Sequence, residues 1–158
     1  SEIWGAFRVG RRAHTLFAKL ENHPAGAEFS GAHDGYWSLP GSVTHTRTAV
    51  IGKDFTVNLR DELTGGGEHC AESWLHLAAG LRLKPAGIGF EALDEQGRAL
   101  MRVEPSDGLL SEIAETPRYP ELGVATQGDS LRMTVAGRLP LVMDCRIVPM
   151  RGGGDTKA

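Results

Sequence analysis

The sequence lacks several features on which whole classes of protein depend. Its 158 residues include only 2 cysteines, so a disulfide-rich scaffold is excluded, and whether Cys70 and Cys145 pair depends on the fold. No apolar run approaches the roughly 20 residues of a membrane-spanning helix. The 17 basic residues are outnumbered by 20 acidic ones, and this balance gives no electrostatic basis for binding nucleic acid.

Standard catalytic signatures are absent as well. The sequence contains no G-x-S-x-G, no phosphate-binding G-x-x-x-x-G-K, no H-E-x-x-H and no C-x-x-C. The 6 histidines are not spaced as metal ligands, although His33, His69 and a carboxylate on neighbouring strands leave a zinc site geometrically open. The sequence therefore predicts neither a metal nor another cofactor in this chain.

Long amphipathic helices are also missing, and an alternation of apolar and polar residues takes their place. A period of two indicates half-buried strands, and it is clearest in residues 14–20, 54–63, 73–79 and 130–137. The apolar residues expected to share a face are Leu16, Ala18 and Leu20, then Phe55, Val57 and Leu59, and then Leu131, Met133 and Val135. Trp74 has few polar neighbours, so we assign it to the core.

Glycine and proline cluster between these stretches, for example in residues 22–26, 39–42, 64–68 and 94–98. Frequent turns and few helix signals predict an all-β fold, an antiparallel β-sandwich of roughly ten to twelve strands in a single domain. Within it, residues 111–116 could form one helical turn, which the prolines that follow would end. We expect the domain to span residues 1–150 and the Gly-rich residues 151–158 to be a disordered tail.

Residues 29–41, FSGAHDGYWSLPG, concentrate polar and aromatic side chains. In one interpretation they form a strand with an irregularity at the Asp-Gly pair, since glycine tolerates positive φ, and then a turn. In the other, the irregularity directs His33 and Tyr36 at a ligand, and either side chain could abstract a proton next to a carboxylate. Spacing alone favours the strand and turn.

Arginines and tryptophans supply the other candidate binding residues. Residues 8–14, RVGRRAH, form a basic stretch, and Arg47 is similar. Guanidinium groups bind carboxylates and sulfates through paired hydrogen bonds, although such runs are also common at solvated strand ends. Trp4 and Trp37 could stack on sugar rings or lie in the core. Both interpretations stay open for these residues.

Several segments recur in a characteristic order along the chain. They are SEIWGAFRVGRRA, then HDGYWSLPGSVTHTRTAVI, then VNLRDELTGGGEHCAESWLHLAAG, and finally RYPELG with RLPLVMDCRIVP. The ordered set covers nearly the whole chain and resembles the C-terminal part of heparinase II/III-like proteins. The resemblance rests on the set, because no single motif in it is diagnostic.

The resemblance implies a fold, an activity and a partner. Such proteins join an N-terminal α-helical toroid to a C-terminal antiparallel β-sandwich, and they are similar to bacterial lyases that cleave acidic polysaccharides by β-elimination. The parent protein is then expected to act on a uronate-containing polysaccharide in the periplasm or cell envelope rather than in the cytoplasm. A divalent metal and the main catalytic residues are implied upstream of this chain, so we expect the chain to be inactive alone.

The resemblance also gives the candidate site residues a role. His33, Tyr36, Trp37 and Arg47 are expected to line one wall of the substrate cleft. Two other functions stay open. The chain could be a non-catalytic carbohydrate-binding module that stacks Trp4 or Trp37 on sugars, or a structural sandwich that supports a partner through an exposed apolar face.

Overall fold

The computed structural model describes residues 3–5 and 8–150, and the regular elements in them are all β-strands. The tail predicted to be disordered, residues 151–158, lies outside the described residues. The strands are β1 (Ile3–Gly5), β2 (Arg8–Val9), β3 (Thr15–His23), β4 (Gly26–Tyr36), β5 (Val43–Gly52), β6 (Val57–Thr64), β7 (Glu68–His76), β8 (Arg82–Ala86), β9 (Gly89–Leu93), β10 (Ala99–Pro105), β11 (Leu110–Glu121), β12 (Val124–Arg138) and β13 (Leu141–Pro149).

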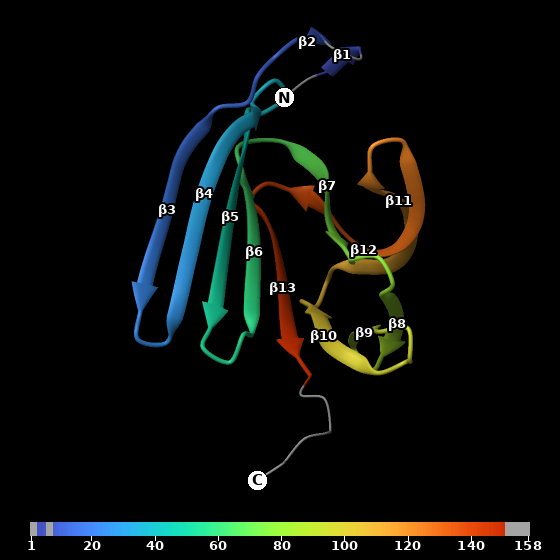
Figure 1. The fold of residues 1–158 in the computed structure, drawn as a ribbon. Helices are drawn as coiled ribbons and strands as arrows, with labels where there is room; N and C mark the ends of the chain where they lie inside the picture. Colours follow the sequence, from blue (N-terminus) through green and yellow to red (C-terminus); the bar gives the residue numbers. More distant parts are fainter. Residues whose placement is uncertain (1–2, 6–7, 151–158) are drawn as a thin grey trace.

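Two antiparallel sheets form the sandwich (Figure 1). The large sheet has 8 strands in the order β3-β4-β5-β6-β13-β10-β9-β8, and the small sheet has 3 in the order β11-β12-β7. The short strands β1 and β2 pair with each other in a separate two-stranded sheet. Eleven strands therefore lie in the two sheets, which confirms the predicted antiparallel sandwich of ten to twelve strands.

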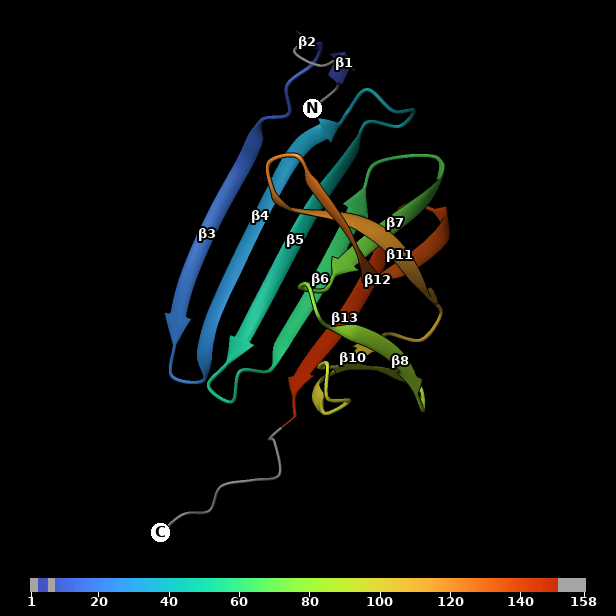
Figure 2. The same ribbon diagram turned by 45° about the vertical axis from the view of Figure 1, so that its right-hand side comes forward.

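The chain passes between the sheets several times. It leaves the large sheet after β6, enters the small sheet as β7, returns for β8 to β10, and crosses again for β11 and β12. The last strand, β13, then inserts between β6 and β10. Figure 2 shows β3, β4, β5, β6 and β13 running side by side along the length of the molecule.

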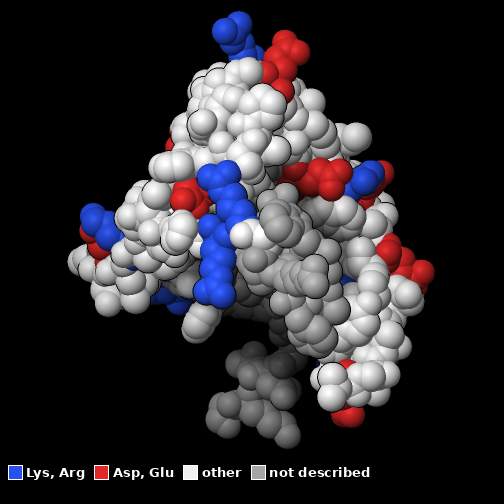
Figure 3. Space-filling view, turned by 90° about the horizontal axis from the view of Figure 1, so that it is seen from above, with Lys and Arg blue, Asp and Glu red and all other residues white. Residues whose placement is uncertain are grey.

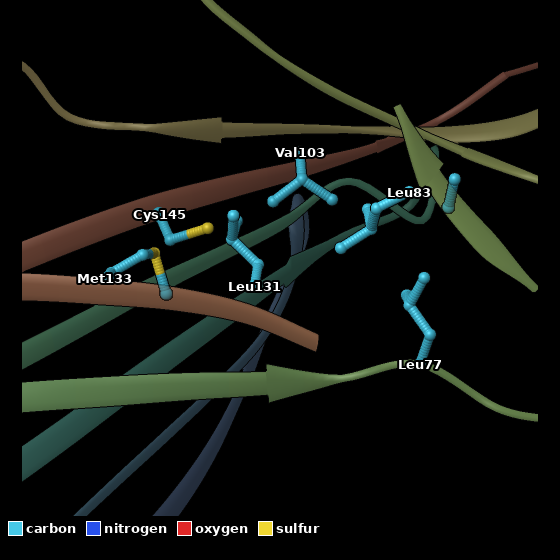
Figure 4. Close-up of a cluster of buried hydrophobic side chains, with 7 residues drawn as sticks. Leu77, Leu83, Val103, Leu131, Met133 and Cys145 are labelled. Carbon is cyan, nitrogen blue, oxygen red and sulfur yellow. The ribbon is translucent and has the colours of Figure 1, made fainter. Parts of the chain in front are cut away.

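The core lies where the small sheet covers the large one. Leu131 on β12 is completely buried and packs with Val103 of β10 and Cys145 of β13 (Figure 4). Leu131 and Met133 share the buried face of β12, as the alternation predicts. Burying a side chain of this size is worth about 1.5–3 kcal/mol, so these contacts hold the two sheets together.

The small sheet leaves part of the large sheet uncovered. Cross-strand partners share a face, and the row Leu20, Phe29, Ala49, Leu59 and Cys145 runs from the edge strand β3 into the core. We call this side the inner face. On it Leu20 is 69% exposed and Phe29 44% exposed, because the described residues place nothing over them. The strand predicted at residues 14–20 is confirmed by β3, but its predicted half-burial is wrong, because the side chains of residues 14–20 are exposed.

Three further expectations are corrected by the fold. Residues 111–116 are part of β11 rather than a helical turn, because they pair residue by residue with β12. Pro117 is accommodated in β11 because this is an edge strand, where a missing N–H can face away from the partner. Phe55 does not share a face with Val57, because it lies in the β5–β6 turn with a φ of 63° and is exposed.

Trp74 is not a core residue. It lies on β7 with Arg132 of β12 as its cross-strand partner, on the side of the small sheet that faces away from the core. The Arg132 guanidinium lies 5.7 Å from the centre of the indole ring. The alternation in residues 73–79 is correct, but the buried side carries Leu75 and Leu77 instead.

Candidate functional site

A groove of about 290 Å³ opens between the edge of β7 and the inner face of β4, β5 and β6. The large sheet contributes the side chains of Tyr36, His45, Arg47 and Asp61 to this groove. The small sheet contributes the consecutive residues 69–74 of β7. With Met143 of β13, the groove brings together residues from five strands, and its floor is polar where β5 meets β6.

The floor is organised by Asp61, whose side chain is only 5% exposed. Asp61 and Arg47 are direct cross-strand partners, and the guanidinium donates two hydrogen bonds to the carboxylate, Nε to Oδ1 and Nη2 to Oδ2, both 2.7 Å. Ser73 of β7 donates a further hydrogen bond to Asp61 Oδ2 at 3.1 Å. This contact ties the small sheet to the floor of the groove.

Two histidines extend the network from Asp61 in a fixed order. His45 Nε2 lies 2.7 Å from Asp61 Oδ1, and His33 Nε2 lies 3.1 Å from His45 Nδ1. The backbone N–H of Gly35 donates to His33 Nδ1 at 3.1 Å. The Gly35 N–H can only donate a hydrogen bond and the Asp61 carboxylate can only accept one, so this geometry assigns the ring proton to Nε2 in both histidines. The chain Gly35–His33–His45–Asp61 is then satisfied at every ring nitrogen.

The network shifts the pKa values of its members. Burial alone would raise the pKa of Asp61, but the hydrogen bonds from His45 and Arg47 and the charge of Arg47 hold it far below its usual range. Burial and the neighbouring His45 lower the pKa of His33. Asp61 therefore stays ionised and His33 stays neutral, in agreement with the direction of the hydrogen bonds.

The upper end of the groove carries exposed aromatic side chains. The Tyr36 ring packs against His33, with 5.3 Å between the ring centres, at the end of β4. Trp37 follows in the turn to β5, where its Nε1 donates to Thr44 Oγ1 at 2.8 Å and leaves the residue 43% exposed. Arg11 is exposed in the segment before β3. The pKa of Asp34, which neighbours His33, is lowered chiefly by the hydrogen bond from the backbone N–H of His14, and the charge of Arg11 adds to this effect. We call Arg11, Tyr36 and Trp37 the rim.

Charges of both signs surround this end of the molecule. Seen from above, Lys and Arg side chains gather in a row near the middle of the view, with Asp and Glu on both sides (Figure 3). This arrangement fits local recognition of an anionic group rather than a broad field of one sign.

The structure brings together three of the four residues predicted to bind substrate. His33 and Arg47 join through His45 and Asp61, and Tyr36 packs on His33, whereas Trp37 stands apart on the turn. The side chain of Trp4, the other candidate for stacking, lies outside the part that the structure describes. Sequence reasoning missed His45 and Asp61, although the two-residue spacing from His45 to Arg47 places both on one face of β5.

Cysteines and metal ligands can also be placed. Cys70 and Cys145 are both free thiols, the first exposed and the second buried. Among the described residues, no three or more His, Cys, Asp or Glu side chains gather as a metal site. Every ring nitrogen of His33 and His45 already has a hydrogen-bond partner, so these side chains do not fit a metal, and a zinc site built on His33 and His69 finds no support.

The described residues also contain no helix long and apolar enough to cross a membrane.

The unequal sheets and the buried polar network define an antiparallel β-sandwich domain. Family comparison gives this class a more specific identity. The chain belongs to the family described as heparinase II/III-like, C-terminal, whose model matches residues 1–152. No curated protein sequence matches the chain as a relative.

Solved structures share the fold at low sequence identity. Heparan sulfate lyase HepC from Pedobacter heparinus is 10% identical, with a TM-score of 0.69 over 91% of this chain and 22% of that chain. A structure of heparinase III is 13% identical, with a TM-score of 0.66 over 92% and 22%. The 4-alpha-glucanotransferase from Thermococcus litoralis is 14% identical, with a TM-score of 0.52 over 84% and 22%. This chain therefore spans about a fifth of the length of the chains it matches.

Proposed function

We propose that this chain forms the β-sandwich wall of a polysaccharide lyase that cleaves a uronate-containing polysaccharide by β-elimination, and that it is inactive alone. The observation that carries the proposal is the rim: Tyr36 is exposed and lines the groove, Trp37 follows it on an exposed turn, and Arg11 is exposed before β3. Aromatic faces and guanidinium groups are well suited to sugar rings and their carboxylates. Membership of the heparinase II/III-like family and a fold like that of a heparan sulfate lyase support it.

The network limits which residues of this chain take part in the chemistry. In β-elimination a base removes the proton next to the uronate carboxylate, and an acid assists the departing oxygen. Both ring nitrogens of His33 and His45 are engaged, so neither accepts that proton without breaking the network. We assign substrate contact to Tyr36 and Trp37, and we assign His33 and Arg47 to holding the sandwich wall that carries the rim.

The test uses the parent protein and follows the ultraviolet absorbance of the unsaturated product. Trp37→Ala should raise KM by about 3- to 10-fold with little change in kcat, as expected for a lost stacking contact. Tyr119→Ala is the control, because Tyr119 is an exposed aromatic residue of β11 in the small sheet that does not line the groove. Equal effects of the two substitutions, or robust turnover by the 158-residue chain alone, would contradict the proposal.

The satisfied network favours a second candidate, a non-catalytic sandwich module. A hydrogen-bond network in which every histidine ring nitrogen has a partner is typical of a structural element that fixes the register of its strands. In this alternative the rim binds glycan without turnover, or the domain only supports the rest of its protein. Glycan binding that is lost in Trp37→Ala, in a parent protein without lyase activity, would select the binding module.

A further inference from the structure

The backbone of β7 has a free side that faces the groove. Leu77 N–H donates to the carbonyl of Asp129 at 3.2 Å, which extends the β7–β12 register. In antiparallel strands, residue pairs that exchange backbone hydrogen bonds alternate with pairs that do not. Because Leu77 is hydrogen-bonded to β12, the other odd-numbered residues of β7 are hydrogen-bonded to β12 as well. The N–H and C=O groups of Cys70, Glu72 and Trp74 therefore point away from β12, and these residues line the groove.

The large sheet extends beyond this edge with an uncovered apolar surface. Leu20, Phe29 and Ile51 lie on the inner face of β3, β4 and β5 and are 69%, 44% and 44% exposed. The opposite face of the same strands carries the polar row Lys19, Ser30, Thr48 and Arg60. A sheet with one polar and one apolar face normally buries the apolar one. We call Leu20, Phe29 and Ile51 the apolar patch.

We propose that an extended β-segment from the rest of a longer polypeptide docks here, with its backbone on the free edge of β7 and its apolar side chains on the apolar patch. Only a strand offers the alternating N–H and C=O groups that a strand edge needs, since a helix satisfies its own backbone. The length of the similar chains supports this occupant, because this chain spans only 22% of heparinase III and of the heparan sulfate lyase. The proposal is independent of the proposed function.

A second copy of this chain does not fit the same edge. Two β7 strands paired edge to edge would be related by a twofold axis perpendicular to the small sheet. The large sheet of the second copy would then lie in the same layer as β3, β4 and β5, which extend past the edge of β7. Both large sheets would need the same space, whereas a single docked strand brings no second layer.

Arg47 adds a chemical requirement for the docked strand. Its Nε and Nη2 are committed to Asp61 and Ser73, and Nη1 has no hydrogen-bond partner within the described part of the chain. We expect the docked strand to alternate apolar residues over the apolar patch and to place a carbonyl or carboxylate oxygen at Nη1.

Thiol labelling of the full-length polypeptide tests the proposal, in a Cys70→Ser background that removes the exposed native thiol. Leu20→Cys reports on the apolar patch, and Leu122→Cys, at a fully exposed hairpin position, is the matched control. The proposal predicts that Leu20→Cys reacts at least about tenfold more slowly than Leu122→Cys. Equal labelling rates would overturn it.

Hydrogen exchange of the unmodified full-length polypeptide keeps the test decisive if a cysteine variant fails to fold. Amides of Cys70, Glu72 and Trp74 should exchange at least about 100-fold more slowly than in an unpaired edge. Rapid exchange at these three positions would overturn the proposal. Protection that appears only at concentrations where the polypeptide dimerises would also overturn it, because the cover would then be a second copy. Neither readout depends on lyase activity.

Discussion

Arg47 and Asp61 face each other directly across β5 and β6, and two hydrogen bonds of 2.7 Å join the guanidinium to the carboxylate. Asp61 stands in an inward-facing row that is otherwise apolar, between Leu59 and Leu63. Its charge is tolerated there because Arg47, His45 and Ser73 all donate to it. The stability of the groove therefore depends on a complete set of partners around one carboxylate.

Asp61→Asn should reduce the free energy of unfolding by about 2–3 kcal/mol, because it replaces charge-assisted hydrogen bonds in a buried site. Asp144→Asn is the matched control on the neighbouring strand β13, where Asp144 forms an exposed ion pair with Arg60. That variant should lose no more than about 1 kcal/mol. Urea unfolding of both variants measures the difference, and equal losses would refute the special role of Asp61.

Asp61 also makes the fold sensitive to acid. Its folded pKa lies below its unfolded value, so its contribution is present at neutral pH and is lost as the pH falls through that lowered pKa. Stability should begin to fall below about pH 4, where the unfolded chain takes up protons first. Asp61→Asn should flatten this part of the stability profile, which thermal unfolding across acidic buffers can follow.

His33 should give a second pH dependence at higher pH. Its folded pKa is lowered by burial and by His45, so the unfolded chain binds the proton more readily. Stability should then decline as the pH falls through the ordinary histidine value of about 6.5. His33→Asn should remove part of this decline, and an unchanged slope between neutral and mildly acidic pH would be inconsistent with the neutral ring.

Gly41 should tolerate no side chain. It has a φ of 81°, and a Cβ atom there would lie 1.9 Å from the carbonyl oxygen of Gly66, while Gly66 N–H donates to Gly41 O at 2.9 Å. Gly97 has a similar φ of 77° with nothing within 4 Å of its Cβ position, so it is the control. Gly97→Ala should cost about 1–2 kcal/mol, the penalty of left-handed backbone alone. Gly41→Ala should cost about 3 kcal/mol or more, because two turns must also separate.

The two thiols should differ sharply in reactivity. Cys70 is exposed on β7, whereas burial and the nearby Asp61 raise the pKa of Cys145 to about 11. In the native state one thiol per chain should react with a chromogenic disulfide reagent, and the second should react only after unfolding. Cys70→Ser should abolish the native-state reaction. Rapid labelling of two thiols would contradict the burial of Cys145.

The sequence predicts the sheets of this molecule well and their environment poorly. Period-two alternation identifies the strands, but it does not say which face is buried, and so the prediction that Trp74 lies in the core is wrong. The same alternation in β3 predicts burial for Leu20 that nothing in the described residues provides. The apolar pattern of a strand reflects the neighbours that cover it in the folded protein. Those neighbours can include segments that are not part of this chain.

For a related reason, the sequence predicts only some of the residues of the candidate site. His33 and Tyr36 stand out in a short stretch, whereas Asp61 joins them through the register between β5 and β6. A shift of one residue would turn Asp61 to the opposite face, and the turn that fixes the register includes Phe55 at positive φ, which no pattern marks. Local sequence thus names candidates, and long-range pairing decides which of them meet.

The position of β13 has a consequence for how the protein is made. Residues 141–149 follow every other strand of the two sheets along the sequence, yet they sit in the middle of the large sheet between β6 and β10. Until they leave the ribosome, the chain holds two separate meanders with unpaired edges at β6 and β10. The large sheet should therefore close in a single late step, and a chain that stops short of Leu141 should remain open at its centre and prone to aggregation.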